Sequence, residues 1–250
     1  MKKFFLLLAV ALPMFFATSC GDDNDESLTL DQTNVTIDYQ KTLELKASEK
    51  NGTWASTNDF VASVDQKGKV TANHEGVATI SYNKDGKTAS CKVTVNATNK
   101  WFSTITQWGV STDQVKNAAN QSNLVLLTEQ DGNLMYTLAG NAYPWYGFFF
   151  TNNSLSGSSV YFTDQQFDDE DFKGYLAQRY QEIETKENGE VVYANSTSLT
   201  TATESAVVAY EGGDDDLWSV TYVPVTHTKA GGIDFDVVKA SKELLKAARK

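Results

Sequence analysis

The stretch WASTNDFVASVDQKGKVTANHEGVATI, residues 54–80, consists of short alternating apolar and polar runs separated by turn signals. Residues 66–69 (Gln-Lys-Gly-Lys) mark one turn, and residues 83–86 (Asn-Lys-Asp-Gly) mark another just beyond the stretch. Strand patterns that recur at intervals of about 8–12 residues are typical of a β-sandwich. The sequence therefore predicts a sandwich over residues 28–97, with no amphipathic helix in it.

Short motifs in this region follow one another in a family-specific order and spacing. They are Trp54–Asn58, Val61–Asp65, Gly68–Ala72, Gly76–Ile80 and Cys91–Val95. In these motifs residues 28–97 resemble the bacterial Ig-like domains of group 2. The resemblance implies an immunoglobulin-like sandwich used as an extracellular spacer or adhesion module, and it supplies no catalytic residues.

Single residues of the sandwich are assigned by their local pattern. We expect Trp54 to anchor the core rather than to bind a ligand. Cys91 lies in an alternating strand pattern, and a free cysteine usually behaves as a small buried hydrophobe. His74 lies in a loop beside Glu75, which is too few donors for a metal site, so we expect a solvated side chain.

Residues 1–19 have the pattern of a secretory signal peptide. A short basic start at Met1–Lys3 precedes an apolar run over Phe4–Phe16, and small residues follow. The apolar run is too short to cross the roughly 30 Å core of a bilayer as a helix. Cleavage and export are therefore favoured over a transmembrane anchor.

The segment Ala17–Cys20 resembles the lipobox of Bacteroidota lipoproteins, in which the cysteine becomes lipidated. This predicts that Cys20 attaches the chain to the outer membrane, and ordinary secretion is the alternative. Residues 20–27 form an acidic tether. An acidic tether behind the lipidated residue resembles the surface-export signal of these lipoproteins, while a linker facing the periplasm remains the other possibility.

Charge and residue usage exclude several function classes. The chain carries 21 Lys and Arg against 32 Asp and Glu, a net charge of −11, which argues against a nucleic-acid partner. With 2 Cys and 2 His, the sequence predicts no cofactor and no metal site. Acidic clusters at residues 168–171 and 214–216 lack the spacing of a calcium loop, and we attribute them to helix capping and to a loop.

Residues 98–250 predict an α+β domain of antiparallel sheet with helices. Ser111 with Gln114 forms a capping box for a first helix, and Asp168 caps a second. The second helix is expected to bury a stripe ending at Ile183 and to end near residues 188–189. A closing helix is expected over residues 233–250. Strand patterns follow each of the first two helices, at residues 124–127, 134–138, 145–150, 160–162, 191–193, 206–210 and 217–223.

The order of these elements predicts a duplicated unit, a helix followed by an antiparallel meander. At the level of this pattern alone, the arrangement is similar to β-lactamase inhibitory proteins and to small outer-membrane assembly lipoproteins. No string of motifs supports that similarity, so it implies nothing about site residues.

The segment Tyr143–Phe150 is the candidate ligand site because it is apolar on both faces of its predicted strand. One interpretation is a central strand covered by a helix on one face and by a domain contact on the other. The other makes Tyr143, Trp145 and Tyr146 an exposed aromatic platform for sugar rings or for a partner protein.

Together these patterns predict a lipid-anchored outer-membrane protein that is not an enzyme and that binds an extracellular ligand. Glycan capture is the favoured version, with the Ig-like domain as a spacer. Adhesion to another protein, or inhibition of one, is the alternative. A glycosidase-like enzyme that uses two carboxylates is the second alternative, although none of the common catalytic motifs occurs and we assign no catalytic residue.

Overall fold

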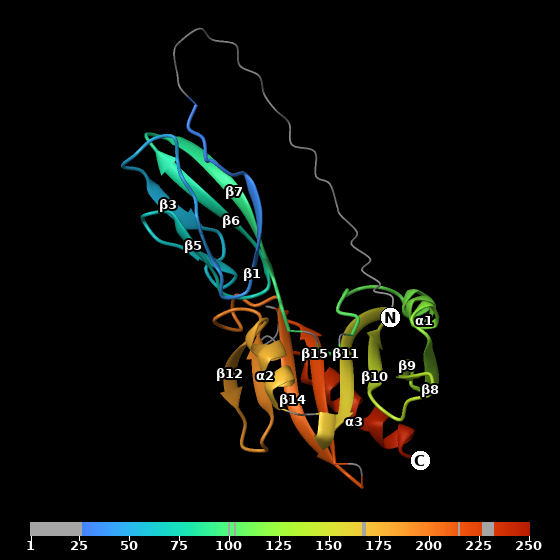
Figure 1. Cartoon of the computed structure of the whole chain (residues 1–250). Coiled ribbons are helices and arrows are strands. Elements are labelled where there is room, and N and C mark those ends of the chain that lie inside the picture. Colours follow the sequence, from blue (N-terminus) through green and yellow to red (C-terminus); the bar gives the residue numbers. More distant parts are fainter. Residues whose placement is uncertain (1–26, 100, 103, 167–168, 215, 227–232) are drawn as a thin grey trace.

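The computed structural model describes residues 27–99, 101–102, 104–166, 169–214, 216–226 and 233–250. Figure 1 shows a narrow sandwich, built from the N-terminal part of the chain, at one end of a wider domain that contains the rest. The predicted signal peptide, Cys20 and the tether up to residue 26 lie outside the described residues, as do Asp168 and Asp215 of the acidic clusters.

The N-terminal part is a sandwich, as predicted. Within the described residues, one sheet has the order β1-β7-β6-β3 and the other β2-β5-β4. The strands are β1 (Asn34–Asp38), β2 (Thr42–Glu44), β3 (Thr53–Ser56), β4 (Ala62–Val64), β5 (Lys69–Ala72), β6 (Gly76–Lys84) and β7 (Lys87–Asn96). Alternation along β6 and β7 turns every second side chain into the space between the sheets, which is why this pattern gives a sandwich.

The expected core residues of the sandwich are confirmed. Trp54 is 6% exposed and packs on Tyr82 with 4.8 Å between ring centroids, and Cys91 is a free, fully buried cysteine. Gly68 has a φ of +87°, and a Cβ there would lie 2.4 Å from the carbonyl oxygen of Leu45. The β4–β5 turn therefore requires glycine for both its conformation and its close packing.

Residues beyond the sandwich form a sheet with helices on both faces. Among the described residues the sheet has eight strands in the order β12-β13-β14-β15-β11-β10-β9-β8, all antiparallel. Its strands are β8 (Leu124–Gln130), β9 (Asn133–Leu138), β10 (Trp145–Thr151), β11 (Ser154–Thr163), β12 (Gln181–Thr185), β13 (Val191–Ala194), β14 (Glu204–Gly212) and β15 (Leu217–Pro224). The helices are α1 (Thr112–Gln121), η1 (Asp164–Gln166), α2 (Asp169–Ala177) and α3 (Phe235–Ala248).

The predicted duplication is present in the fold. Helix α1 precedes the meander β8–β11, α2 precedes the meander β12–β15, and the last strands of the two meanders, β11 and β15, pair side by side. An offset of 60 positions relates residues that enter the same core. These pairs are Tyr146 and Ala206, Phe148 and Val208, Val160 and Val220, and Phe162 and Tyr222.

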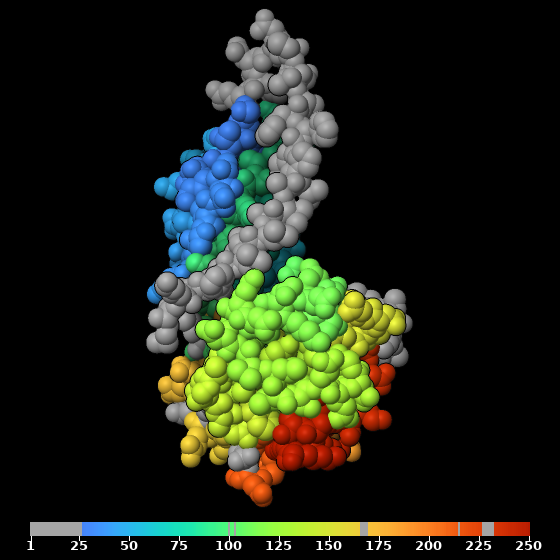
Figure 2. Space-filling view, turned by 90° about the vertical axis from the view of Figure 1, so that its right-hand side faces the viewer, coloured from blue at the N-terminus to red at the C-terminus, as the bar shows by residue number. Residues whose placement is uncertain are grey.

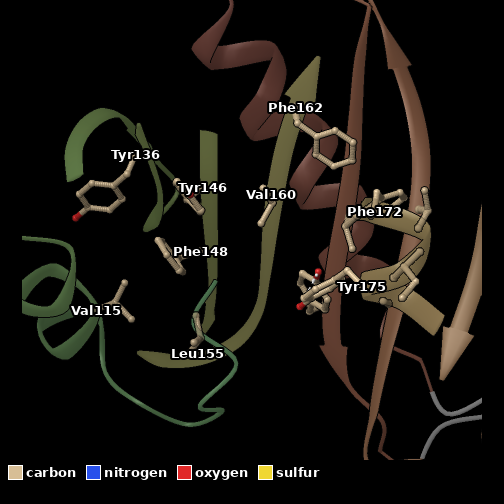
Figure 3. Packing of buried hydrophobic residues seen from close by; sticks show 14 of the residues in the cluster. Val115, Tyr136, Tyr146, Phe148, Leu155, Val160, Phe162, Phe172 and Tyr175 are labelled. Carbon is tan, nitrogen blue, oxygen red and sulfur yellow. Dashed lines mark hydrogen bonds between the residues drawn. The ribbon is translucent and has the colours of Figure 1, made fainter. Parts of the chain in front are cut away.

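Helices α1 and α2 cover one face of the sheet, and their packing forms the larger core. Figure 3 shows Val115 of α1 facing Tyr146, Phe148 and Leu155, while Phe172 of α2 lies against Phe162. The capping box of α1 is confirmed, since Ser111 Oγ accepts from the Gln114 backbone and the Gln114 side chain accepts from the Ser111 backbone.

The second helix is shorter than predicted. It ends at Ala177, and Ile183 lies in the edge strand β12 instead of continuing the helical stripe. Phe172 and Leu176 are buried as expected. The stripe pattern failed at its end because the β-branched Ile183 lies between glutamates, an alternation that also suits a strand.

Helix α3 packs on the opposite face of the sheet and is fixed there by buried hydroxyl groups. Ser241 Oγ lies 2.6 Å from the Tyr161 hydroxyl and 3.1 Å from Ser159 Oγ, which in turn lies 2.8 Å from Thr221 Oγ1. Each of these polar groups is buried and each has a partner, so the network specifies the position of the helix on the sheet.

Candidate functional site

The candidate platform lies where β9 connects to β10, on the α3 face of the sheet. Tyr143 and Trp145 are both half-buried, and their rings stack with 4.8 Å between centroids and an angle of 29° between planes. The peptide bond between Tyr143 and Pro144 is cis. Trp145 Nε1 donates to the carbonyl oxygen of Ala142, which fixes the orientation of the indole ring. The structure thus brings two of the three predicted aromatic residues together.

The third predicted residue, Tyr146, is turned to the other side of the sheet. It is 7% exposed and lies in the core beneath α1 (Figure 3). Burial raises the pKa of Tyr146 to about 12. Neighbouring residues of a strand point to opposite faces, so Tyr146 cannot share a surface with Trp145. The surface open to a ligand at this place is formed by Tyr143 and Trp145.

The loop between β9 and β10 is held by a buried hydroxyl group. Thr137 Oγ1 donates to the carbonyl oxygen of Asn141 at 3.1 Å and lies 3.4 Å from that of Pro144. The exposed Asn141 donates from its amide to the carbonyl oxygen of Ala139. A loop fixed in this way presents aromatic faces without having to be ordered on binding.

Strand register extends the platform toward the edge of the sheet. Val125 of β8 is the partner of Thr137, and Thr137 is the partner of Trp145. Cross-strand partners share a face, so these residues form a row from the sheet edge to the aromatic pair. Val125 is 50% exposed. The row could therefore be found only once the register was known.

A second exposed aromatic pair occurs in the other half of the sheet, with a different geometry. Tyr210 is 54% exposed, and its ring is tilted by 58° against that of Trp218. The Tyr210 hydroxyl donates to Asp216 and the Trp218 indole donates to Asp164. The first bond lies across the β14–β15 turn and the second joins β15 to the end of β11. The tilted rings offer no common flat surface.

A carboxylate with a perturbed pKa lies away from the platform. Glu204, at the start of β14, accepts hydrogen bonds from the Tyr180 hydroxyl and from the Trp108 side chain. Burial is the largest influence on the group and raises the pKa of Glu204. This acid joins the end of the α2 region to the chain preceding α1, which is a structural role. Within the described residues, no three His, Cys, Asp or Glu side chains gather as a metal site would require.

The raised pKa of Glu204 has a consequence for the pH dependence of stability. The folded chain holds this proton more tightly than the unfolded chain, whose reference pKa is 4.5. The contribution of protonated Glu204 to stability is therefore fully present below about pH 4.5 and is lost as pH rises through the folded pKa. We expect Glu204→Gln to be more stable relative to the parent chain at pH 7 than at pH 4, as measured by denaturant unfolding at both values. An equal difference at the two pH values would contradict the assignment.

The two domains meet at the loop before β6, a contact that the sequence patterns did not indicate. Arg179 Nε lies 2.6 Å from Glu75 Oε2, and the Glu75 backbone donates to the carbonyl oxygen of Gln178. Gln178 Oε1 in turn accepts from the backbone of Thr98 and Asn99. These bonds join the domain linker, the end of the α2 region and the sandwich.

His74 takes part in the same region and is not the solvated residue that the sequence predicts. Its ring stacks on Phe60 at 3.7 Å, and Nδ1 lies 2.7 Å from the Phe60 carbonyl oxygen. Burial lowers the pKa of His74. An open hollow of about 540 Å³ lies beside this pair, and its lining also includes Tyr39, Asp59 and Gln181.

Comparison with known proteins identifies the sandwich. Residues 26–95 match the family model of the bacterial Ig-like domain (group 2). The N-terminal sandwich is a bacterial Ig-like domain. The match confirms the resemblance carried by the motifs from Trp54 to Val95, and it ends before the second domain begins. A bacterial Ig-like domain indicates a protein of the cell surface or the extracellular space with a role in binding or adhesion.

Other comparisons add little to the bacterial Ig-like domain. No curated protein matches the chain. Domains 4 and 5 of the S-layer protein SbsC are 15% identical, with 80% of this chain and 86% of that chain covered and a TM-score of 0.26. Extracellular domains 3–5 of Drosophila OTK are 13% identical, with 78% and 58% covered and a TM-score of 0.20. At such scores neither likeness bears on function. None of the helices in the described part of the chain is long and apolar enough to span a membrane.

Proposed function

We propose that this protein is a lipid-anchored, surface-exposed lipoprotein that captures a glycan without catalysing a reaction. Cys20 attaches it to the outer membrane, the acidic tether and the bacterial Ig-like domain extend it outward, and the second domain binds the ligand. The observation that carries the ligand class is the stacked, half-buried pair of Tyr143 and Trp145.

An aromatic pair of this geometry suits a sugar ring. The apolar face of a pyranose stacks on an aromatic ring, and the nearby amide of Asn141 and the backbone of the loop offer hydrogen-bond partners. Because Trp145 is already fixed by Tyr143 and by Ala142, stacking orders few additional groups. The bacterial Ig-like domain indicates a protein of the cell surface or the extracellular space, and this supports an extracellular ligand.

Glycan binding by the full chain is tested first on a glycan array, and each glycan bound is then measured by calorimetry. We expect Trp145→Ala to weaken binding at least about tenfold, since buried or clustered tryptophans dominate binding energies. Tyr210→Ala is the control, because it removes an exposed aromatic ring from the other half of the sheet. Circular dichroism establishes that both variants are folded.

Other outcomes of this experiment would overturn the proposal. Binding that survives Trp145→Ala would move the glycan site elsewhere, with the hollow beside Tyr39 and His74 as the next place to examine. An array without any bound glycan would remove the ligand class. Turnover of a bound glycan that is abolished by substitution of one carboxylate would make the protein a hydrolase.

A further inference from the structure

The β8 strand leaves an unusual edge on the sheet. It is the last strand in the sheet order over the residues that the structure describes, and three of its consecutive aliphatic side chains are exposed. Val125, Leu126 and Leu127 are 50%, 44% and 42% exposed. Figure 2 faces this side of the molecule, where the yellow-green surface lies above the red surface of α3. Native sheets normally protect an edge of this kind with charges or proline.

The opposite edge of the same sheet has that protection. Strand β12 carries exposed Glu182 and Glu184 on either side of Ile183, which is half-buried. Repulsion and desolvation of these carboxylates oppose the approach of another strand. The two edges occupy equivalent places in the duplicated unit, but only β8 exposes three consecutive aliphatic residues, and its one carboxylate, Glu129, pairs with Lys116 of α1 at 3.1 Å. The duplicated fold therefore does not by itself require these aliphatic residues, because β12 occupies the equivalent place without them.

Both faces of the sheet are apolar next to the β8 edge. Val125 shares its face with Thr137 and Trp145, whereas Leu126 is the register partner of Tyr136 on the face covered by α1. The register shifts at Leu127. A strand added alongside β8 could thus bury aliphatic side chains on either face while its backbone continues the hydrogen-bond ladder.

An acidic hollow lies at the C-terminal end of β8. About 300 Å³ in volume, it is bounded by the β8–β9 turn and α3. Asp131, Asp236 and Glu243 line it together with a single lysine, Lys239. Glu243 already pairs with Lys246 at 2.8 Å. Asp131 and Asp236 are therefore the lining carboxylates that we expect to pair with an incoming cation. Such a hollow attracts a positively charged side chain.

We propose that the β8 edge binds an extended polypeptide segment that adds to the sheet as an antiparallel strand, apolar in its middle and basic at its N-terminal end. Every pairing in the sheet is antiparallel, and an antiparallel partner places its N-terminus beside the end of β8 at Gln130. The basic residue then enters the hollow at Asp131 and Asp236. A second copy of this chain is disfavoured by its net charge of −11.

This interaction goes beyond glycan capture and does not depend on it. The ligand class differs, and the residues that carry it lie on the sheet edge rather than at the aromatic pair. A protein ligand at β8 would make the molecule an adhesive or inhibitory module in addition to a glycan receptor.

The experiment uses the full chain and a fluorescent peptide, Lys-Val-Thr-Val-Thr-Val-Thr, with a second peptide in which glutamate replaces the lysine. By fluorescence anisotropy, we expect the lysine peptide to bind at least fivefold more tightly than the glutamate peptide. We also expect the bound lysine peptide to slow hydrogen exchange in β8. Leu126→Lys is expected to weaken binding at least tenfold. Val77→Lys, at a comparably exposed aliphatic residue of the Ig-like domain, serves as the matched control and is expected to leave binding unchanged. Asp131→Asn is expected to remove the preference for lysine.

Three results would overturn the proposal. The first is equal binding to the parent chain and to Leu126→Lys, checked with Val125→Lys as a second variant should the first fail to fold. The second is protection from exchange at β12 or elsewhere in place of β8. The third is a dimer of the parent chain in analytical ultracentrifugation that Leu126→Lys dissociates, since a second copy would then occupy the edge.

Discussion

A Cys20→Ser chain is expected to leave the membrane fraction almost completely, whereas the parent chain stays with it. Acyl chains stabilise membrane association by about 0.8 kcal/mol for each buried methylene, so a lipidated cysteine is enough to hold the protein at the membrane. A serine at this position has no sulfur atom and cannot form the thioether bond to the lipid. The measurement is cell fractionation combined with metabolic labelling by a fatty-acid analogue, and label is expected in the parent chain alone.

The second cysteine of the chain supplies the control for this experiment. Cys91 is fully buried in the bacterial Ig-like domain, and burial raises the pKa of its thiol, so it is a poor acceptor for modification. Cys91→Ala is expected to keep both the label and the membrane association. A soluble parent chain whose mature form carries an unmodified thiol at Cys20 would contradict lipid anchoring. For an anchored chain, digestion by protease added to intact cells distinguishes exposure on the outer surface from a location in the periplasm.

Phe148→Ala is expected to destabilise the second domain by about 3–5 kcal/mol. Phe148 is 1% exposed, and it lies at the centre of the core between the sheet and α1, with the Tyr136 ring 6.0 Å away. Removal of the ring takes away apolar contacts on several sides and leaves a cavity that the sheet cannot close without moving α1. A loss of this size is a large part of the total stability of an ordinary domain.

Calorimetry measures this effect with an internal reference. The transition of the second domain is expected to move to a lower temperature, while that of the bacterial Ig-like domain, whose core contains Trp54 and Cys91, stays in place. Val77→Ala provides a substitution at an exposed aliphatic residue and is expected to change neither transition by more than about 0.5 kcal/mol. A Phe148→Ala chain with an unchanged second transition would show that the core between α1 and the sheet contributes little.

Helices, strands and turns could be predicted where the conformation favoured by neighbouring residues is also the one that the tertiary structure contains. The Ser111–Gln114 capping box is a local hydrogen-bonding motif, and the Gln130–Asn133 turn is fixed by the left-handed conformations of Asp131 and Gly132. Both could be found from neighbouring residues alone. The end of α2 could not, because Ile183 fits a helical stripe and an edge strand equally well until its partner β13 is known.

Sequence alone determined the Ig-like domain, the duplicated helix and meander, and the burial of Cys91, because alternation, capping and spacing are local properties of a chain. Tertiary structure decided which aromatic residues share a surface, since Trp145 and Tyr146 part to opposite faces and only the former meets Tyr143. It also decided that β8 ends the sheet with aliphatic side chains exposed. Whether a strand is central or at the edge depends on pairings between residues far apart in the chain, and no local pattern contains that information.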